Sequence, residues 1–91
     1  EEFLMVLFNT DIKDIKLFSE RLHNAISEIG LPSGKPLTAS IGGTVLEKGD
    51  LAQPNLIAQQ LLKADKALYE AKANKRAHTR IYDSVHGIVK I

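Results

Sequence analysis

The sequence predicts a small mixed α/β fold in which two helices pack on one face of a sheet. Three observations lead to this prediction. A short apolar run stands near the start of the chain, and two amphipathic stretches with helical spacing follow. A run rich in Thr, Val and Ile comes after the first of them, and a run that predicts a short strand comes after the second. Strand–helix–strand units join parallel strands through a right-handed crossover. Two such units in succession therefore give an α/β sandwich, ordered strand, helix, strand, helix, strand.

The first strand and the first helix are expected before Gly30. Residues 3–8 read FLMVLF, a continuous apolar run typical of a strand that is buried on both faces. The side-chain oxygens of residues 9–11 suit a turn and a helix N-cap. Apolar side chains then recur at helical spacing, at Ile12, Ile15, Phe18, Leu22, Ala25, Ile26 and Ile29. This stripe predicts an amphipathic helix that is stopped by Gly30 and Pro32.

The second unit is expected after a loop over residues 31–36. Residues 37–47 are rich in Thr, Val and Ile, and the Gly42-Gly43 pair among them indicates a bend, a bulge or a close backbone approach. After a polar loop over residues 48–54, residues 55–76 consist mainly of strong helix formers. The apolar stripe of this helix is Ile57, Leu61, Ala64, Leu68 and Ala71.

The end of the chain is less clearly patterned. Residues 78–82 predict a short final strand. Residues 84–91 are compatible with a strand or with the start of a linker. We therefore assign residues 1–83 to the domain and residues 84–91 to a tail or linker.

Composition fits one small folded domain and excludes several classes of protein. Of the 91 residues, 44% are hydrophobic and 25% are charged, which argues against disorder. There is no cysteine, so the chain has neither a disulfide framework nor a thiolate metal site, as suits a reducing cytoplasm. The 12 basic and 11 acidic residues are scattered without a basic stripe for nucleic acid. No apolar run approaches the about 20 residues of a membrane helix.

Three stretches, in matching order and spacing, resemble one protein family. Residues 1–3 (EEF) match the last three letters of a GG(D/E)EF signature. Residues 37–42 (LTASIG) resemble the family's strand ending in Ser-Ile-Gly, and residues 64–76 (ADKALYEAKANKR) closely resemble its ADxALYxAKxxGRN helix. The chain therefore resembles the C-terminal half of a GGDEF domain of the diguanylate cyclase family, and it begins inside the signature.

The resemblance implies a half domain of the ferredoxin-like fold that is similar in core to nucleotidyl cyclases and polymerase palms. It implies that two complete domains face each other as a homodimer, each holding one GTP, and join the two GTP into cyclic di-GMP with Mg²⁺. Phosphoryl transfer spreads negative charge, so such a site needs divalent cations and basic side chains. The resemblance also implies a bacterial cytoplasmic domain, and leaves open whether the parent attaches it to a sensory or membrane domain.

Four site residues follow from the resemblance. Glu1, at the third signature position, would be a catalytic Mg²⁺ ligand and a candidate acceptor of the 3′-hydroxyl proton, and Glu2 would help to bind a second Mg²⁺. Lys72 and Arg76 would contact the terminal phosphates of GTP, and a spacing of four on one helix would place them on one face. The alternatives are a solvated pair of terminal carboxylates and two cations that complement the helix dipole.

Two positions depart from the family pattern. Lys75 stands where the family has glycine, and Ala77 where it has asparagine. Loss of a C-capping glycine is expected to let the helix run on or fray. These departures favour an alternative function, a degenerate GGDEF module that binds nucleotide or mediates dimerisation without turnover. An unrelated ferredoxin-like domain is a further alternative. The three histidines, which lack ligand spacing, are interpreted as structural or surface residues: His23, His78 and His86.

The upstream half of a family domain would supply the signature glycines, a metal-binding aspartate and the strand between the first two strands predicted here. Without that strand the sheet would have unpaired inner edges and an exposed apolar face. We therefore expect the 91 residues alone to be inactive. We also expect the missing half, or a second copy, to complete the sheet.

Overall fold

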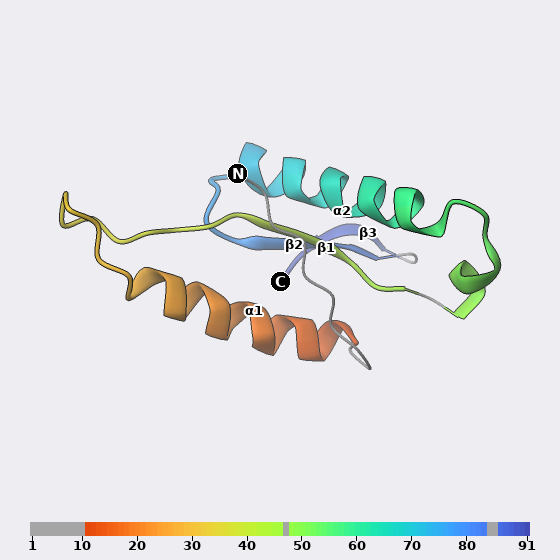
Figure 1. The fold of residues 1–91 in the computed structure, drawn as a ribbon, viewed down its shortest axis with the longest axis horizontal. Coiled ribbons are helices and arrows are strands. Elements are labelled where there is room, and N and C mark those ends of the chain that lie inside the picture. The colour runs from red at the N-terminus through yellow and green to blue at the C-terminus, as the bar shows by residue number, and fades with distance from the viewer. Residues whose placement is uncertain (1–10, 47, 84–85) are drawn as a thin grey trace.

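The computed structural model of the protein describes residues 11–46, 48–83 and 86–91. Its elements are α1 (Ile12–Ser27), β1 (Ile41–Thr44), the 3₁₀ helix η1 (Lys48–Ala52), α2 (Leu56–Ala73), β2 (Thr79–Asp83) and β3 (Gly87–Lys90). Figure 1 shows the strands between the two α-helices. The predicted mixed α/β class is therefore confirmed at this coarse level. The strand predicted over residues 3–8 lies outside the described residues.

The described strands form one sheet in the order β1-β2-β3. Strands β1 and β2 are parallel, with Ile41 opposite Thr79 and Gly43 opposite Ile81. The predicted strand–helix–strand unit is thus β1-α2-β2. Strand β3 pairs antiparallel with β2. Of the two alternatives for residues 84–91, a strand or the start of a linker, the structure therefore shows a strand.

The two helices lie on opposite faces of the sheet (Figure 1), so the prediction that both pack on one face is wrong. Side chains alternate between the two faces of a strand. In β2, Thr79 contacts α1, whereas Tyr82 lies under the ammonium of Lys63 on α2, 5.4 Å from ring centroid to Nζ. Periodicity shows that a helix has an apolar face, but it does not show which face of the sheet that helix covers.

Helix α2 makes the closest contact with the sheet. Its Ala67 and Ala71 are completely buried. A Cβ atom on Gly42 would lie 2.2 Å from the backbone nitrogen of Leu68 and other atoms of α2. The glycine pair therefore marks a close backbone approach, one of the three alternatives that the sequence indicated.

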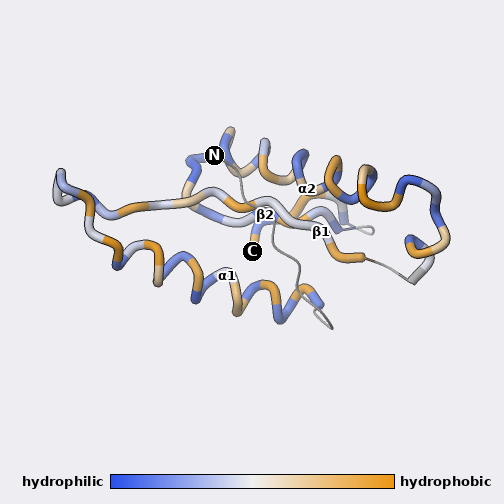
Figure 2. The backbone as a smooth tube through the Cα atoms, in the orientation of Figure 1, coloured by the Kyte–Doolittle hydropathy of each residue, from blue (hydrophilic) through white to orange (hydrophobic). Residues whose placement is uncertain are grey.

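Helix α1 begins where the sequence predicted. The Asp11 carboxylate accepts a hydrogen bond from the Asp14 N–H at 2.9 Å and caps the helix. The helix ends at Ser27, three residues before Gly30. Figure 2 shows apolar and hydrophilic positions alternating along both helices. No helix among the described residues has the length and apolar character needed to cross a membrane.

Candidate functional site

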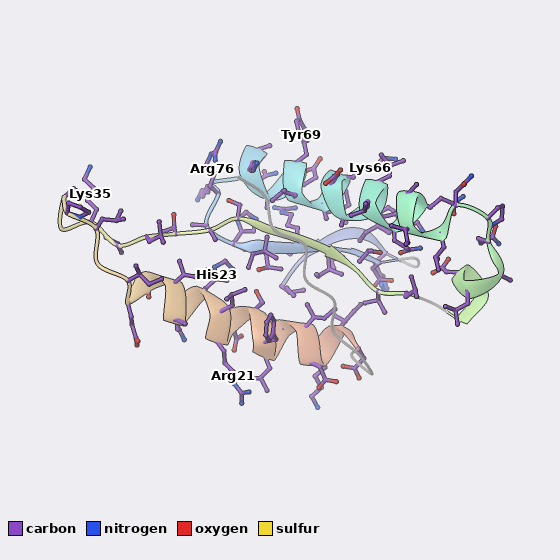
Figure 3. All side chains as sticks on the ribbon, in the orientation of Figure 1. Arg21, His23, Lys35, Lys66, Tyr69 and Arg76 are labelled. Atoms are coloured by element: carbon purple, nitrogen blue, oxygen red, sulfur yellow. The ribbon has the colours of Figure 1, made fainter. Side chains whose placement is uncertain are left out.

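The predicted phosphate-binding residues lie at the C-terminal end of α2. Lys72 is in the last turn of the helix. Arg76 lies beyond the final helical residue, Ala73 (Figure 3), so the argument that a shared helix face brings the two cations together is wrong. Both side chains are exposed. Glu1 and Glu2 lie outside the described residues, and their assignments stay predictions.

The helix does not run on past the position where the family has glycine. Asn74 is its C-cap, and Lys75 has a φ of 76°. The Arg76 N–H donates to the carbonyl of Ala71 at 3.0 Å, which is the six-residue closure of a Schellman motif around a left-handed residue. Glycine adopts this conformation without steric cost. Lys75 therefore keeps the backbone conformation that a glycine would favour here.

The left-handed conformation continues through the next two residues. Arg76 and Ala77 have φ values of 52° and 53°, and we call residues 75–77 the Arg76 loop. The Ala77 N–H donates to Ser40 Oγ at 3.0 Å. His78 Nδ1 lies 2.9 Å from the carbonyl oxygen of Arg76, and since a carbonyl only accepts, Nδ1 carries the proton. His78 Nε2 then accepts from Arg80 Nε at 3.1 Å.

The end of α2 offers positive charge that a ligand could use. Among residues 11–46, 48–83 and 86–91, neither Lys72 nor Arg76 has a carboxylate partner for its charged group. A guanidinium presents paired donors to a phosphate, and an ammonium adds a mobile point charge. Lys72 and Arg76 are therefore the candidate oxyanion-binding groups at this end of the molecule.

A second cluster of polar side chains joins α1 to the start of β2. Ser19 and Thr79 are both buried, and their hydroxyls are hydrogen-bonded to each other. His23 Nε2 is 2.8 Å from Thr79 Oγ1. Burial, and secondarily the proximity of His78, lowers the pKa of His23 below its usual 6.5. His23 and His78 are thus neighbours in the fold. The sequence did not predict this, because the two residues are far apart along the chain.

An open pocket of about 340 Å³ lies beside this cluster. Residues of α1, of the Arg76 loop and of β2 line it, among them Lys16, Glu20, His23 and His78. Sequence reasoning missed this pocket because its walls come from segments far apart in the chain. His86 instead lies on the surface, 3.1 Å from the Asp83 carboxylate, in agreement with the surface role predicted for it.

A metal site requires several ligating side chains close together. No group of three or more His, Cys, Asp or Glu side chains among residues 11–46, 48–83 and 86–91 could hold a metal ion. The carboxylates that the sequence assigned to Mg²⁺ are Glu1 and Glu2, which precede the described part of the chain. The described residues therefore do not test the predicted metal site.

Comparison with known proteins gives no match: neither a family model, nor a curated protein, nor a solved structure is significantly similar to this chain. The resemblance to GGDEF domains thus depends on the three sequence stretches alone.

Proposed function

We propose that this chain is the C-terminal half of a GGDEF domain whose complete form is a diguanylate cyclase. The observation that carries the proposal is the backbone conformation of Lys75. In the family pattern this position is glycine, and here the residue has a φ of 76°, in the region that favours glycine. The motif thus retains its local geometry where its sequence departs from the pattern.

The contact between two of the motif segments gives further support. Gly42, the last residue of the Ser-Ile-Gly stretch, packs against the backbone of Ala64 and Leu68 in the ADKALYEAKANKR helix. Ser40 of the same stretch bonds the Arg76 loop after that helix. Segments that resemble one family in sequence are therefore also in direct contact, as parts of one site should be.

In the proposed reaction, two domains each present one GTP, and the 3′-hydroxyl of each ribose attacks the α-phosphorus of the other GTP. Each attack forms a new P–O bond, breaks the bond between the α-phosphorus and the bridging oxygen, and releases pyrophosphate, while Glu1 is the candidate acceptor of the hydroxyl proton. Lys72 and Arg76 bind the terminal phosphates and orient the nucleotide through charge-assisted hydrogen bonds. Glu1 and Glu2 are the predicted ligands of Mg²⁺, which when bound would supply further neutralisation of phosphate charge. The cyclase reaction requires the complete domain, and we propose that the 91 residues alone do not carry it out.

The alternative function is a degenerate module that binds nucleotide or mediates dimerisation without turnover. Three consecutive residues with positive φ, none of them glycine, favour it. Such residues each cost about 1–3 kcal/mol. The Arg76 loop therefore carries strain, and a glycine at position 75, as in the family, would relieve the part that Lys75 causes.

The test measures GTP binding by calorimetry and cyclic di-GMP by chromatography, in the complete protein that contains this chain, with Mg²⁺. We expect Arg76→Ala to weaken GTP binding about tenfold to a hundredfold, because the binding free energy lost with one hydrogen bond to a charged group corresponds to that change in affinity. Lys66→Ala is the matched control, since Lys66 is also an exposed cation and lies on α2 (Figure 3).

The outcomes separate the two functions. Formation of cyclic di-GMP supports the cyclase. Binding that depends on Arg76 without any product supports the degenerate module. If GTP binds with the same affinity to the wild type, Arg76→Ala and Lys66→Ala, both proposals for this end of α2 are wrong.

A further inference from the structure

The backbone of Arg76 is held from three directions. Its N–H donates to the carbonyl of Ala71 at the end of α2. Its own carbonyl accepts from the His78 ring at 2.9 Å. The following N–H, that of Ala77, donates to Ser40 Oγ at 3.0 Å. Only the first of these bonds belongs to the end of the helix, whereas the other two come from side chains.

We infer that Ser40 and His78 are positioning residues that fix the Arg76 loop so that the Arg76 guanidinium is pre-organised for an oxyanion. This inference depends on the proposed function, in which that oxyanion is the terminal phosphate of a nucleoside triphosphate. Neither residue need touch the ligand, since each acts through the backbone of the loop.

The strain in the loop is the reason that it needs such partners. Three successive non-glycine residues with φ between 52° and 76° persist only where the surrounding structure holds them. Without the side-chain bonds, right-handed or extended conformations would be accessible to Arg76 and Ala77. The guanidinium would then sample many positions, and binding would have to supply the cost of ordering it.

Ser40 and His78 can hold the loop because the sheet holds them. Ser40 directly precedes β1, and the next residue, Ile41, donates its N–H to the carbonyl of His78 at 3.0 Å. The His78 ring is fixed in turn by Arg80 of β2, whose Nε donates to Nε2 at 3.1 Å. The loop is therefore tied to the rigid end of two paired parallel strands.

The experiment is a double-mutant cycle in the complete protein, with GTP as the probe and calorimetric affinity as the readout. Ser40→Ala should weaken GTP binding about three- to tenfold, the value of one neutral hydrogen bond. Ser40→Thr keeps the hydroxyl and should restore binding. In an Arg76→Ala background, Ser40→Ala should have no further effect, because a positioning residue acts only through the group that it positions.

His78 is tested in the same way. His78→Ala should weaken binding to a similar extent, and His78→Asn should restore part of it, since the asparagine amide can donate to the Arg76 carbonyl as Nδ1 does. Equal losses from Ser40→Ala with and without the Arg76 side chain would overturn the inference. So would a failure of Ser40→Thr and His78→Asn to restore binding.

A measurement without ligand separates this inference from the proposed function. The backbone chemical shifts of Arg76 and Ala77 report left-handed φ directly. We expect Ser40→Ala to move them toward random-coil values and Ser40→Thr to retain the wild-type shifts. If Arg76→Ala leaves GTP binding unchanged, the phosphate-binding role proposed for Arg76 is wrong, whereas unchanged shifts in Ser40→Ala would overturn the positioning role itself.

Discussion

The two α-helices are attached to the sheet in different ways. Helix α2 lies against the sheet through close apolar packing, with Ala67 and Ala71 completely buried and Gly42 against its backbone. Ser19 is the one buried residue of α1, and its hydroxyl bonds Thr79. Among the described residues, the completely buried side chains of α2 are therefore apolar, whereas the buried contact of α1 is polar.

The largest effect is expected at Gly42, where β1 packs directly against the backbone of α2. In Gly42→Ala the new methyl group would lie 2.2 Å from the Leu68 nitrogen and 2.4 Å from the Ala64 oxygen, and backbone atoms cannot rotate away. We expect the free energy of unfolding to fall by at least about 3 kcal/mol, at or beyond the usual range for overpacking. Urea denaturation of the complete protein measures this. Gly49→Ala is the control, because no atom lies within 4 Å of its Cβ position.

A smaller loss is expected from breaking the polar contact of α1. Thr79→Val keeps the shape of the side chain but leaves the Ser19 hydroxyl and His23 without their partner, at a cost of about 1–3 kcal/mol in the free energy of unfolding. Ser19→Ala added to Thr79→Val removes the other buried hydroxyl and should recover part of the loss. If the double variant is less stable than Thr79→Val, the Ser19 side chain contributes through its packing rather than through its hydrogen bond, and the contrast between the helices is wrong.

Lys75→Gly should instead stabilise the protein. Glycine adopts a φ of 76° without steric cost, so we expect the free energy of unfolding to rise by about 0.5–1 kcal/mol. Thermal denaturation checks this, with Lys72→Gly as the control, because the same exchange inside α2 should instead destabilise the helix by about 1 kcal/mol. A loss of stability in Lys75→Gly would show that the lysine side chain compensates the strain.

The smallest effect concerns pH. The charged or titratable groups around the partly buried His23 are Lys16, Glu20 and His78. Because the pKa of His23 is lowered in the folded protein, the unfolded chain binds more protons just below pH 6.5. The contribution of His23 to the free energy of unfolding should thus be constant above pH 6.5. It should decline as the pH falls from 6.5 toward the lower pKa that His23 has in the folded protein. His23→Gln should flatten the pH profile of the melting temperature, and an unchanged profile would exclude His23 as its source.

The sequence predicted local features well. The stripe from Ile12 onward predicted α1, and the composition of residues 55–76 predicted α2. The Gly42-Gly43 pair indicated the close approach as one of three alternatives. In each case the signal lies in neighbouring residues, within the reach of one helical turn or one strand pleat.

What the sequence did not predict depends on residues that are distant or atypical. Nothing in the sequence near His23 indicates that His78 will lie beside it, because only the fold brings them together. Arg76 was placed on the helix because lysine at position 75 gives no signal for a left-handed residue. The face of the sheet that α1 covers was missed because helical periodicity shows only that the helix has an apolar face.

The contact between Ser19 and Thr79 also bears on the order of folding. It joins residues 60 positions apart, whereas Thr44 and Gln60, which connect β1 to α2, are separated by 16. Closing a longer loop costs more chain entropy, and distant contacts form late. We therefore expect β1, α2 and β2 to assemble first and α1 to dock last and open first. Amide hydrogens of α1 should then exchange with solvent faster than those of α2, and equal rates would show that the two helices open together.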